Sequence, residues 1–136
     1  QRTVLCFLFF KTIILIFCLI GIAITLYISI AHALKKKVIC PINSKSCNIV
    51  LDSKYSRTLG IKNEIIGLAY YIGILIVVFT NPSQNLLLAT KLISILASAY
   101  SLILINIQIR VLNNYCSWCI TTAVINVFIS ALIITL

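Results

Sequence analysis

The chain has 136 residues, of which 62% are hydrophobic and only 10% charged, with a mean hydropathy of +1.16. In a typical soluble domain about a quarter of the residues are charged, so this composition excludes an ordinary soluble protein. It predicts a membrane protein with one domain over residues 1–136. The net charge of +9 would suit nucleic acid, but the cations gather in one segment beside the apolar runs, which favours lipid headgroups or an acidic partner surface. We therefore predict no nucleic-acid partner. The chain begins with Gln1 and has no methionine, so we expect that targeting signals or a fused domain have been trimmed.

The first predicted element is the apolar run from Val4 to Leu34. At a rise of about 1.5 Å per residue, this helix exceeds the hydrocarbon core of about 30 Å, so it protrudes or tilts. Three lysines, at positions 35–37, end the run at the headgroup boundary. Residues 38–63 form the one long polar segment, for which we expect a loop with a short amphipathic turn on the membrane surface.

Three further apolar runs follow, over Glu64–Thr80, Leu86–Ile107 and Cys116–Leu136. The stretch NPSQN at 81–85 predicts a tight polar turn, and a short link over 108–115 precedes the last run. Backbone polar groups must be paired within lipid, so the pattern predicts an all-α membrane protein, a four-transmembrane-helix bundle with one long cysteine-containing loop between helices 1 and 2. Four crossings put both chain ends on one side of the membrane. The other side then receives Cys40, Cys47, Cys116 and Cys119 together.

The stretch YCSWCITT opens the fourth predicted helix and holds Cys116 and Cys119. Three positions apart, these thiols share one helix face. The unpaired N–H groups and the positive dipole end of a first helical turn favour a thiolate there, which makes the pair a good exchange partner. Asn113 and Asn114 are candidate caps for this helix.

Cys40 and Cys47 form a second pair, with six residues between them in the polar segment. A flexible loop can carry their disulfide toward Cys116 and Cys119 and away again. Thiol–disulfide exchange proceeds by attack of a thiolate on a neighbouring disulfide. Two mobile sulfurs and two fixed ones make a relay, in which the loop pair exchanges with an outside protein and the helix pair with an acceptor in the membrane.

Other interpretations of these side chains stay open. Four cysteines can bind structural zinc, although a pair separated by six residues is loose for a zinc knuckle and no histidine is near, so we predict no metal site. Two structural disulfides in a non-catalytic membrane protein are a further alternative. Cys6 and Cys18 lie inside the first apolar run and are interpreted as apolar filler. His32, at the end of that run, is interpreted as an interfacial residue rather than a base.

An ordered set of motifs links the two cysteine pairs. The loop pair is followed by S-x-x-x-x-x-x-G from Ser53 to Gly60, by NEIIG at 63–67, and by C-x-x-C-I-T-T at 116–122. Each motif is weak alone. Their order and spacing over about residues 40–127 resemble the vitamin K epoxide reductase family. The resemblance implies a four-helix bundle around a quinone, with the C-x-x-C at the end of the fourth helix.

The resemblance also implies a role for each matching residue. Cys116 and Cys119 match the redox pair, in which Cys119 faces the quinone and Cys116 exchanges with the loop. Cys47 matches the loop cysteine that bridges to Cys116, and Cys40 matches the cysteine that exchanges with the partner. Asn63 matches an asparagine that hydrogen-bonds a quinone carbonyl, while the pattern alone equally permits an N-cap of the second helix.

Four more positions match less sharply. Ser53 matches a loop serine that helps to hold the site closed, with a solvated loop serine as the alternative. Gly60 and Gly67 match glycines needed for a turn and for close helix packing. Ala123, predicted at the cofactor, departs from animal members of the family, which carry a tyrosine there that contacts the vitamin K oxygen. Bacterial members resemble this chain at that position.

This departure favours quinone reduction over epoxide reduction. Bacterial members oxidise a thioredoxin-like partner, separate or fused, and pass its electrons to ubiquinone or menaquinone. We therefore predict a membrane thiol–disulfide oxidoreductase with a quinone as cofactor, supporting disulfide bond formation. The alternative is a vitamin K epoxide or quinone reductase, which shares the cysteines but turns over a vitamin K-type substrate with a dithiol reductant.

Two arguments on orientation conflict. Disulfide formation belongs on the oxidising side of a plasma or inner membrane, which places residues 38–63 outside the cytoplasm. The positive-inside rule predicts the reverse, because eight cations lie at the cysteine face and three elsewhere. We favour the redox argument, with the inverted orientation as the alternative. The eight cations are Lys35, Lys36, Lys37, Lys45, Lys54, Arg57, Lys62 and Arg110.

Overall fold

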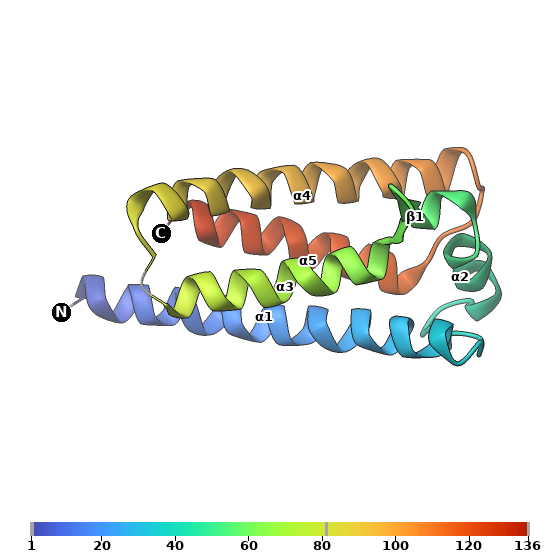
Figure 1. Ribbon diagram of the computed structural model, residues 1–136, viewed down its shortest axis with the longest axis horizontal. Coiled ribbons are helices and arrows are strands. Elements are labelled where there is room, and N and C mark those ends of the chain that lie inside the picture. The colour runs from blue at the N-terminus through green and yellow to red at the C-terminus, as the bar shows by residue number, and fades with distance from the viewer. Residues whose placement is uncertain (1, 81, 136) are drawn as a thin grey trace.

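The structure, a computed structural model, describes residues 2–80 and 82–135; Asn81 of the predicted turn and Leu136 of the last apolar run lie outside the described residues, as does Gln1. Four long helices run alongside one another, with both chain ends at one end of the molecule (Figure 1). The short elements of residues 44–62 cover the opposite end. In chain order the elements are α1 (Arg2–Ala33), α2 (Ser44–Leu51), the 3-10 turn η1 (Lys54–Ser56), β1 (Arg57–Thr58), β2 (Ile61–Lys62), α3 (Asn63–Phe79), α4 (Gln84–Arg110) and α5 (Ser117–Ile134).

Three of the described helices, α1, α4 and α5, are long and apolar enough to cross a membrane. Helix α3 is equally apolar but has 17 residues. Large apolar side chains are exposed along the outside of these helices, such as Leu96 and Ile103 on α4 and Phe128 on α5. Such a surface is stable against lipid rather than water. The protein is therefore an all-α protein that is integral to a membrane.

Both ends of α4 extend beyond the predicted run over Leu86–Ile107. Helix α4 begins at Gln84, inside the predicted turn over 81–85, because the Ser83 hydroxyl caps it by accepting a hydrogen bond from the Leu86 N–H at 3.3 Å. The same helix continues to Arg110, which shortens the link to α5.

The polar segment is more ordered than the predicted loop. Asn43 caps α2 by accepting from the Ser46 N–H at 3.2 Å, and α2 buries its apolar side against the end of the bundle. The predicted short amphipathic turn is therefore the helix α2, and its position at the membrane surface stays a prediction. Strands β1 and β2 then pair antiparallel, and the two residues between them, Leu59 and Gly60, have φ of 54° and 83°. A glycine is favoured at such an angle, in agreement with the role assigned to Gly60. The buried residues of α2 are Ser46, Cys47, Val50 and Leu51.

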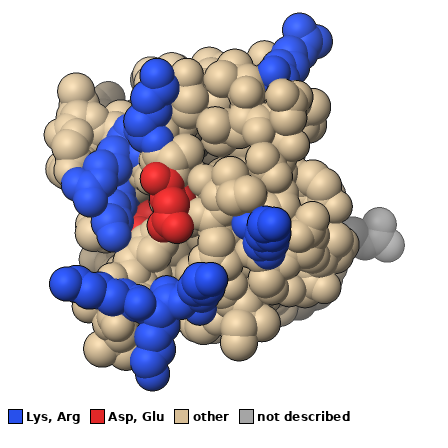
Figure 2. All heavy atoms as spheres, turned by 90° about the vertical axis from the view of Figure 1, so that its right-hand side faces the viewer, with Lys and Arg blue, Asp and Glu red and all other residues tan. Residues whose placement is uncertain are grey.

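Basic side chains surround this end of the molecule. Figure 2 views the end that carries α2 and the strands, and lysine and arginine side chains project from it on several sides around a small acidic area. Asp52 is an exposed acid of this region, since it directly follows α2. The cationic end is thus the same end at which the cysteines meet.

Helices α1 and α3 pack closely at Gly21. A Cβ atom at this position would lie 2.6 Å from the ring of Tyr71, which is 1% exposed. We expect Gly21→Ala to lower the free energy of unfolding by about 1–3 kcal/mol, because the buried ring must shift. Gly73→Ala is the matched control, since nothing lies within 4 Å of its Cβ position. Thermal unfolding in detergent measures both, and equal midpoints for the two variants would contradict the close packing.

Candidate active site

Cys116 lies directly before α5 and acts as its N-cap. Its sulfur accepts a hydrogen bond from the Cys119 N–H at 3.3 Å. The pKa of the Cys116 thiol is below its usual value, chiefly because the Cys119 side chain hydrogen-bonds to it and also because the Cys119 and Trp118 backbone N–H groups do so, against the opposing effect of burial. The thiolate expected at this helix start is therefore centred on Cys116.

Two backbone N–H groups just before α5 donate hydrogen bonds to other helices, and we call this pair of bonds the backbone clamp. The Tyr115 N–H donates to the Ser46 hydroxyl of α2 at 2.8 Å, and the Cys116 N–H donates to the Gln108 side-chain oxygen of α4 at 3.1 Å. Asn114, a predicted cap, instead accepts from Ser46 at 3.3 Å. The prediction of Asn113 or Asn114 as the cap of α5 is wrong, because Cys116 occupies the capping position. The clamp connects the cysteine-bearing end of α5 to both α2 and α4.

Cys40 and Cys47 form a disulfide, whereas Cys116 and Cys119 are free thiols. The sulfurs of Cys40, Cys47 and Cys116 all lie within 4.8 Å of one another, and all three residues are buried. A low-pKa thiol therefore sits beside a disulfide, which is the arrangement that thiol–disulfide exchange requires. With the Cys40–Cys47 disulfide formed, this trio of cysteines provides a single free thiol, that of Cys116. A structural zinc site takes four ligands.

Cys119 faces a cavity of about 660 Å³ inside the bundle. This volume lies within the usual range of small-molecule sites, about 300–1,000 Å³. The wall is mostly apolar and draws residues from α1, α3, α4 and α5 and from the segment between α2 and α3. Cys119 is the one cysteine among the described residues of the wall, so it lies between the cavity and the other three cysteines of this end.

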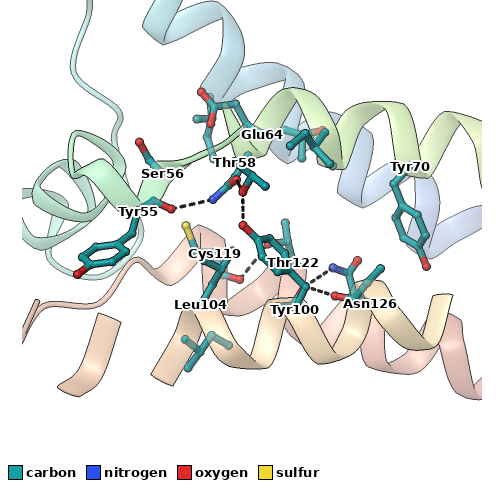
Figure 3. Close-up of a pocket in the computed structure, with 18 of the residues that line it drawn as sticks. Tyr55, Ser56, Thr58, Glu64, Tyr70, Tyr100, Leu104, Cys119, Thr122 and Asn126 are labelled. Carbon is teal, nitrogen blue, oxygen red and sulfur yellow. Dashed lines mark hydrogen bonds between the residues drawn. The ribbon is translucent and has the colours of Figure 1, made fainter. Parts of the chain in front are cut away.

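A hydrogen-bonded group lies at the Cys119 end of the cavity (Figure 3). The Thr58 hydroxyl donates to the Asn63 side-chain oxygen at 2.7 Å and is also hydrogen-bonded to the Tyr100 hydroxyl. The Asn63 amide donates to the Tyr55 carbonyl at 3.0 Å. Lys62, not Asn63, occupies the capping position of α3, so the N-cap interpretation of Asn63 is wrong. Asn63 points its polar side chain into the cavity wall instead.

Two other predicted cofactor residues occupy different places. Ser53 lines the cavity, and its hydroxyl donates to the Val50 carbonyl at 2.7 Å, so it fastens the end of α2. Ala123 is 2% exposed and is not among the described residues of the wall. On α5, Thr122 and Asn126 line the cavity in its place. In this structure position 123 therefore packs against neighbouring helices, and the placement of Ala123 at the cofactor stays a prediction.

A second polar group lies farther from Cys119. The Tyr71 hydroxyl donates to the Asn126 side-chain oxygen at 2.6 Å, and the Asn126 amide donates to Ser101 at 2.7 Å. Tyr70, also in the wall, has a buried hydroxyl without a hydrogen-bond partner among the described residues. Figure 3 shows Tyr70 and Asn126 at the other side of the cavity from Tyr55. The cavity thus has polar groups near both ends.

Sequence reasoning missed one further group beside the cavity. The His32 Nδ1 lies 2.5 Å from a carboxylate oxygen of Glu64, and the two side chains are 11% and 4% exposed. His32 is therefore paired with a carboxylate and mostly buried, a contact that its interpretation as an interfacial residue did not include. The available signal was Glu64 itself, one of two acidic residues in the chain, at the start of an apolar run. Gln108, which accepts a hydrogen bond from the Cys116 N–H, was also not predicted, and the sequence carried no comparable signal for it.

Comparisons with known proteins identify the family. The family model described as the vitamin K epoxide reductase family matches residues 12–134, which is nearly the whole chain. No curated protein matches the chain. The match extends over all four long helices and over both cysteine pairs. The chain therefore belongs to the vitamin K epoxide reductase family.

Proposed function

We propose that the chain is a membrane thiol–disulfide oxidoreductase that oxidises a thioredoxin-like partner, separate or fused, and reduces a quinone, thereby supporting disulfide bond formation. Membership of the family supports a membrane oxidoreductase. One observation carries the finer proposal: Cys116 lies within 4.8 Å of both sulfurs of the Cys40–Cys47 disulfide, while its neighbour Cys119 lines the cavity. Electrons can therefore pass from the loop to the cavity through sulfur atoms alone.

The outer exchange begins at Cys40. Cys40 is 7% exposed and Cys47 is 0% exposed, so Cys40 is the more accessible sulfur. A partner thiolate attacks Cys40, which forms a partner–Cys40 disulfide and releases Cys47 as a thiolate. The second thiol of the partner then attacks the partner's sulfur in that mixed disulfide. The partner leaves with an internal disulfide, and Cys40 is released as a thiol. Because Cys40 is mostly buried, we expect the chain around it to shift when the partner binds.

The inner exchange joins Cys47 to Cys116. The Cys47 thiolate attacks Cys116 of an oxidised Cys116–Cys119 pair, which releases Cys119 as the thiolate. Cys40 then attacks Cys47, which restores the loop disulfide and frees Cys116 as a thiolate, while the proton of the Cys40 thiol passes to Cys119. The products are a loop disulfide and two free cysteines on α5, the same redox state that the structure describes.

The residues of the cavity fit a quinone. An apolar wall suits the ring and its tail, and the buried Tyr70 hydroxyl has no partner among the described residues, so a carbonyl oxygen would satisfy it. The Asn63 amide has two N–H groups and gives one to Tyr55. Asn63 and Cys119 would hold the head group, with Ser53 fastening the wall near them. When bound, a quinone supplies a two-electron acceptor; ubiquinone, menaquinone and vitamin K-type quinones share this chemistry.

We further propose four membrane crossings in one domain over residues 1–136. At about 1.5 Å per residue, the 17 residues of α3 span about 26 Å, and slight bilayer thinning accommodates the difference from about 30 Å. The family match and the side-by-side helices support this topology. The cysteine end faces the extracytoplasmic side, where disulfides persist, although its basic residues would favour the cytoplasm.

The test uses the purified protein in detergent with a reduced thioredoxin-like protein and a soluble ubiquinone analogue. We expect one partner disulfide for each hydroquinone formed, because each transfer moves two electrons. Protein alkylated on its thiols is the control and is expected to be inactive. Turnover of vitamin K epoxide with a dithiol, without quinone reduction by the partner, would favour the alternative activity. One bound zinc per chain without either activity would favour a structural protein.

A further inference from the structure

The buried pair of His32 and Glu64 is unusual for this chain. The sequence contains one histidine and two acidic residues, yet two of these three groups meet at 2.5 Å across 32 positions. His32 lies in the last turn of α1 and Glu64 in the first turn of α3. Ionisable groups within membrane helices are costly, and where they occur they commonly serve proton or ion transfer.

The pair connects the polar end of the molecule to the cavity. Glu64 lines the cavity, while His32 is not among the described residues of its wall and stands behind Glu64, close to the lysines at 35–37. Figure 3 shows Glu64 at the same side of the cavity as Thr58, away from Tyr70. Glu64 is the one carboxylic acid among the described residues of the wall. The other titratable groups of the wall are Cys119, Tyr55, Tyr70, Tyr71 and Tyr100.

Proton balance creates a need for such a group. When Cys116 reacts as a thiolate, the Cys116–Cys119 pair carries only one proton, on Cys119. Formation of the Cys116–Cys119 disulfide then releases two electrons and that one proton. Reduction of a quinone to a hydroquinone consumes two electrons and two protons. One proton must therefore come from another donor beside the cavity.

We propose that Glu64 donates this second proton and that His32 returns a proton to Glu64 from water at the polar end. The inference rests on the proposed function, since it concerns the reduction of a quinone in this cavity. An imidazole carries two nitrogens that can each donate or accept a proton, which suits His32 to resupply a carboxylate oxygen 2.5 Å from its Nδ1. Each cycle thus forms one S–S bond, moves two electrons to the quinone and transfers one proton from Cys119 and one from Glu64.

The main test compares Glu64→Gln with wild-type protein in a single turnover. Dithiol-reduced protein is mixed with a soluble ubiquinone analogue, and hydroquinone formation is followed by stopped flow. We expect Glu64→Gln to slow this step by about 10²–10⁴-fold, the usual contribution of general acid catalysis. Glu64→Asp keeps an acid and should recover part of the rate. Asp52→Asn removes the other acid of the chain, which is exposed and outside the wall, and should leave the rate unchanged.

Two readouts separate proton donation from a structural role. Quenching of Trp118, the single tryptophan, measures quinone binding, which should stay within about two-fold of wild type in Glu64→Gln. Thiol trapping measures exchange between a dithiol and the Cys40–Cys47 disulfide, which should also be unchanged. In His32→Gln repeated turnovers should slow more than the first one, because the proton given up by Glu64 must then be returned without His32. This variant carries the test if Glu64→Gln does not fold.

The outcomes are distinct. Wild-type turnover with an equally fast Glu64→Gln protein overturns the inference and leaves the proposed function in place. Loss of quinone binding or of loop exchange in Glu64→Gln assigns the pair to structure and also overturns the inference. Absence of quinone reduction by wild-type protein overturns the proposed function and the inference with it.

Discussion

Cys119→Ala is expected to abolish quinone reduction, with a fall in turnover of at least about a thousand-fold. Cys119 is the one cysteine among the described residues that line the cavity, and Cys116 is fully buried behind it. Loss of a reacting nucleophile removes the chemical step itself, and effects of such size are usual for groups of this kind. The measurement is hydroquinone formation with reduced partner and a soluble quinone.

Two other cysteines provide controls for this loss. Cys6 is exposed near the opposite end of α1, and Cys18 is buried within the bundle. Cys6→Ala and Cys18→Ala should keep wild-type turnover, although Cys18→Ala loses some stability through the space that it leaves. Full turnover in Cys119→Ala would show that the sulfur relay is wrong.

Cys40→Ser is expected to trap a disulfide between Cys47 and Cys116. In this variant the Cys47 thiolate can still attack an oxidised Cys116–Cys119 pair, since the wild-type sulfurs lie within 4.8 Å. No Cys40 thiol is then present to resolve the mixed disulfide, so it accumulates and partner-driven turnover falls by about a hundred-fold or more. Mass spectrometry of peptides under non-reducing conditions identifies the bond.

The position of the trapped bond tests the order of the relay. Cys6→Ser, which changes a cysteine outside the trio, should show no cross-link between the loop and α5. The companion variant Cys47→Ser leaves Cys40 as the loop thiol. An equally abundant Cys40–Cys116 bond in that companion would reverse the roles given to the two loop cysteines. A Cys40→Ser protein bridged through Cys119 would contradict the inner exchange.

The sequence predicted those features that depend on hydrophobic runs and their interruptions. Apolar length predicted the membrane helices, and the number of runs placed the cysteine pairs at one end, where the structure brings together Cys40, Cys47 and Cys116. The exact start of α5 was harder to predict, because asparagine has a higher N-cap propensity than cysteine, which favoured Asn114 over Cys116. Tertiary contact with Ser46 of α2 engages Asn114 and leaves the capping position to sulfur.

Features that depend on side-chain direction were not predictable from periodicity. Ala123 and Thr122 are adjacent on α5, yet only Thr122 lines the cavity, because the rotation of this helix is set by its packing against α4 and α1. The pairing of His32 with Glu64 joins two helices across 32 positions, and no local pattern encodes such a contact. The order in residues 44–62 was not predicted because the polar composition of this segment indicates a loop. The helix α2 is stabilised by burial of its apolar side, which depends on tertiary contacts.

Burial of the loop disulfide also affects which reductants can serve the protein. Dithiols of similar reduction potential are equivalent thermodynamically, so equilibrium alone would let any abundant small thiol donate electrons. Cys47 and Cys116 are 0% exposed and Cys40 is 7% exposed, which leaves a freely diffusing thiol only a narrow approach, through Cys40. For the proposed oxidoreductase we therefore expect selection among reductants to be kinetic, because access to Cys40, rather than reduction potential, would limit the leakage of electrons from the soluble thiol pool.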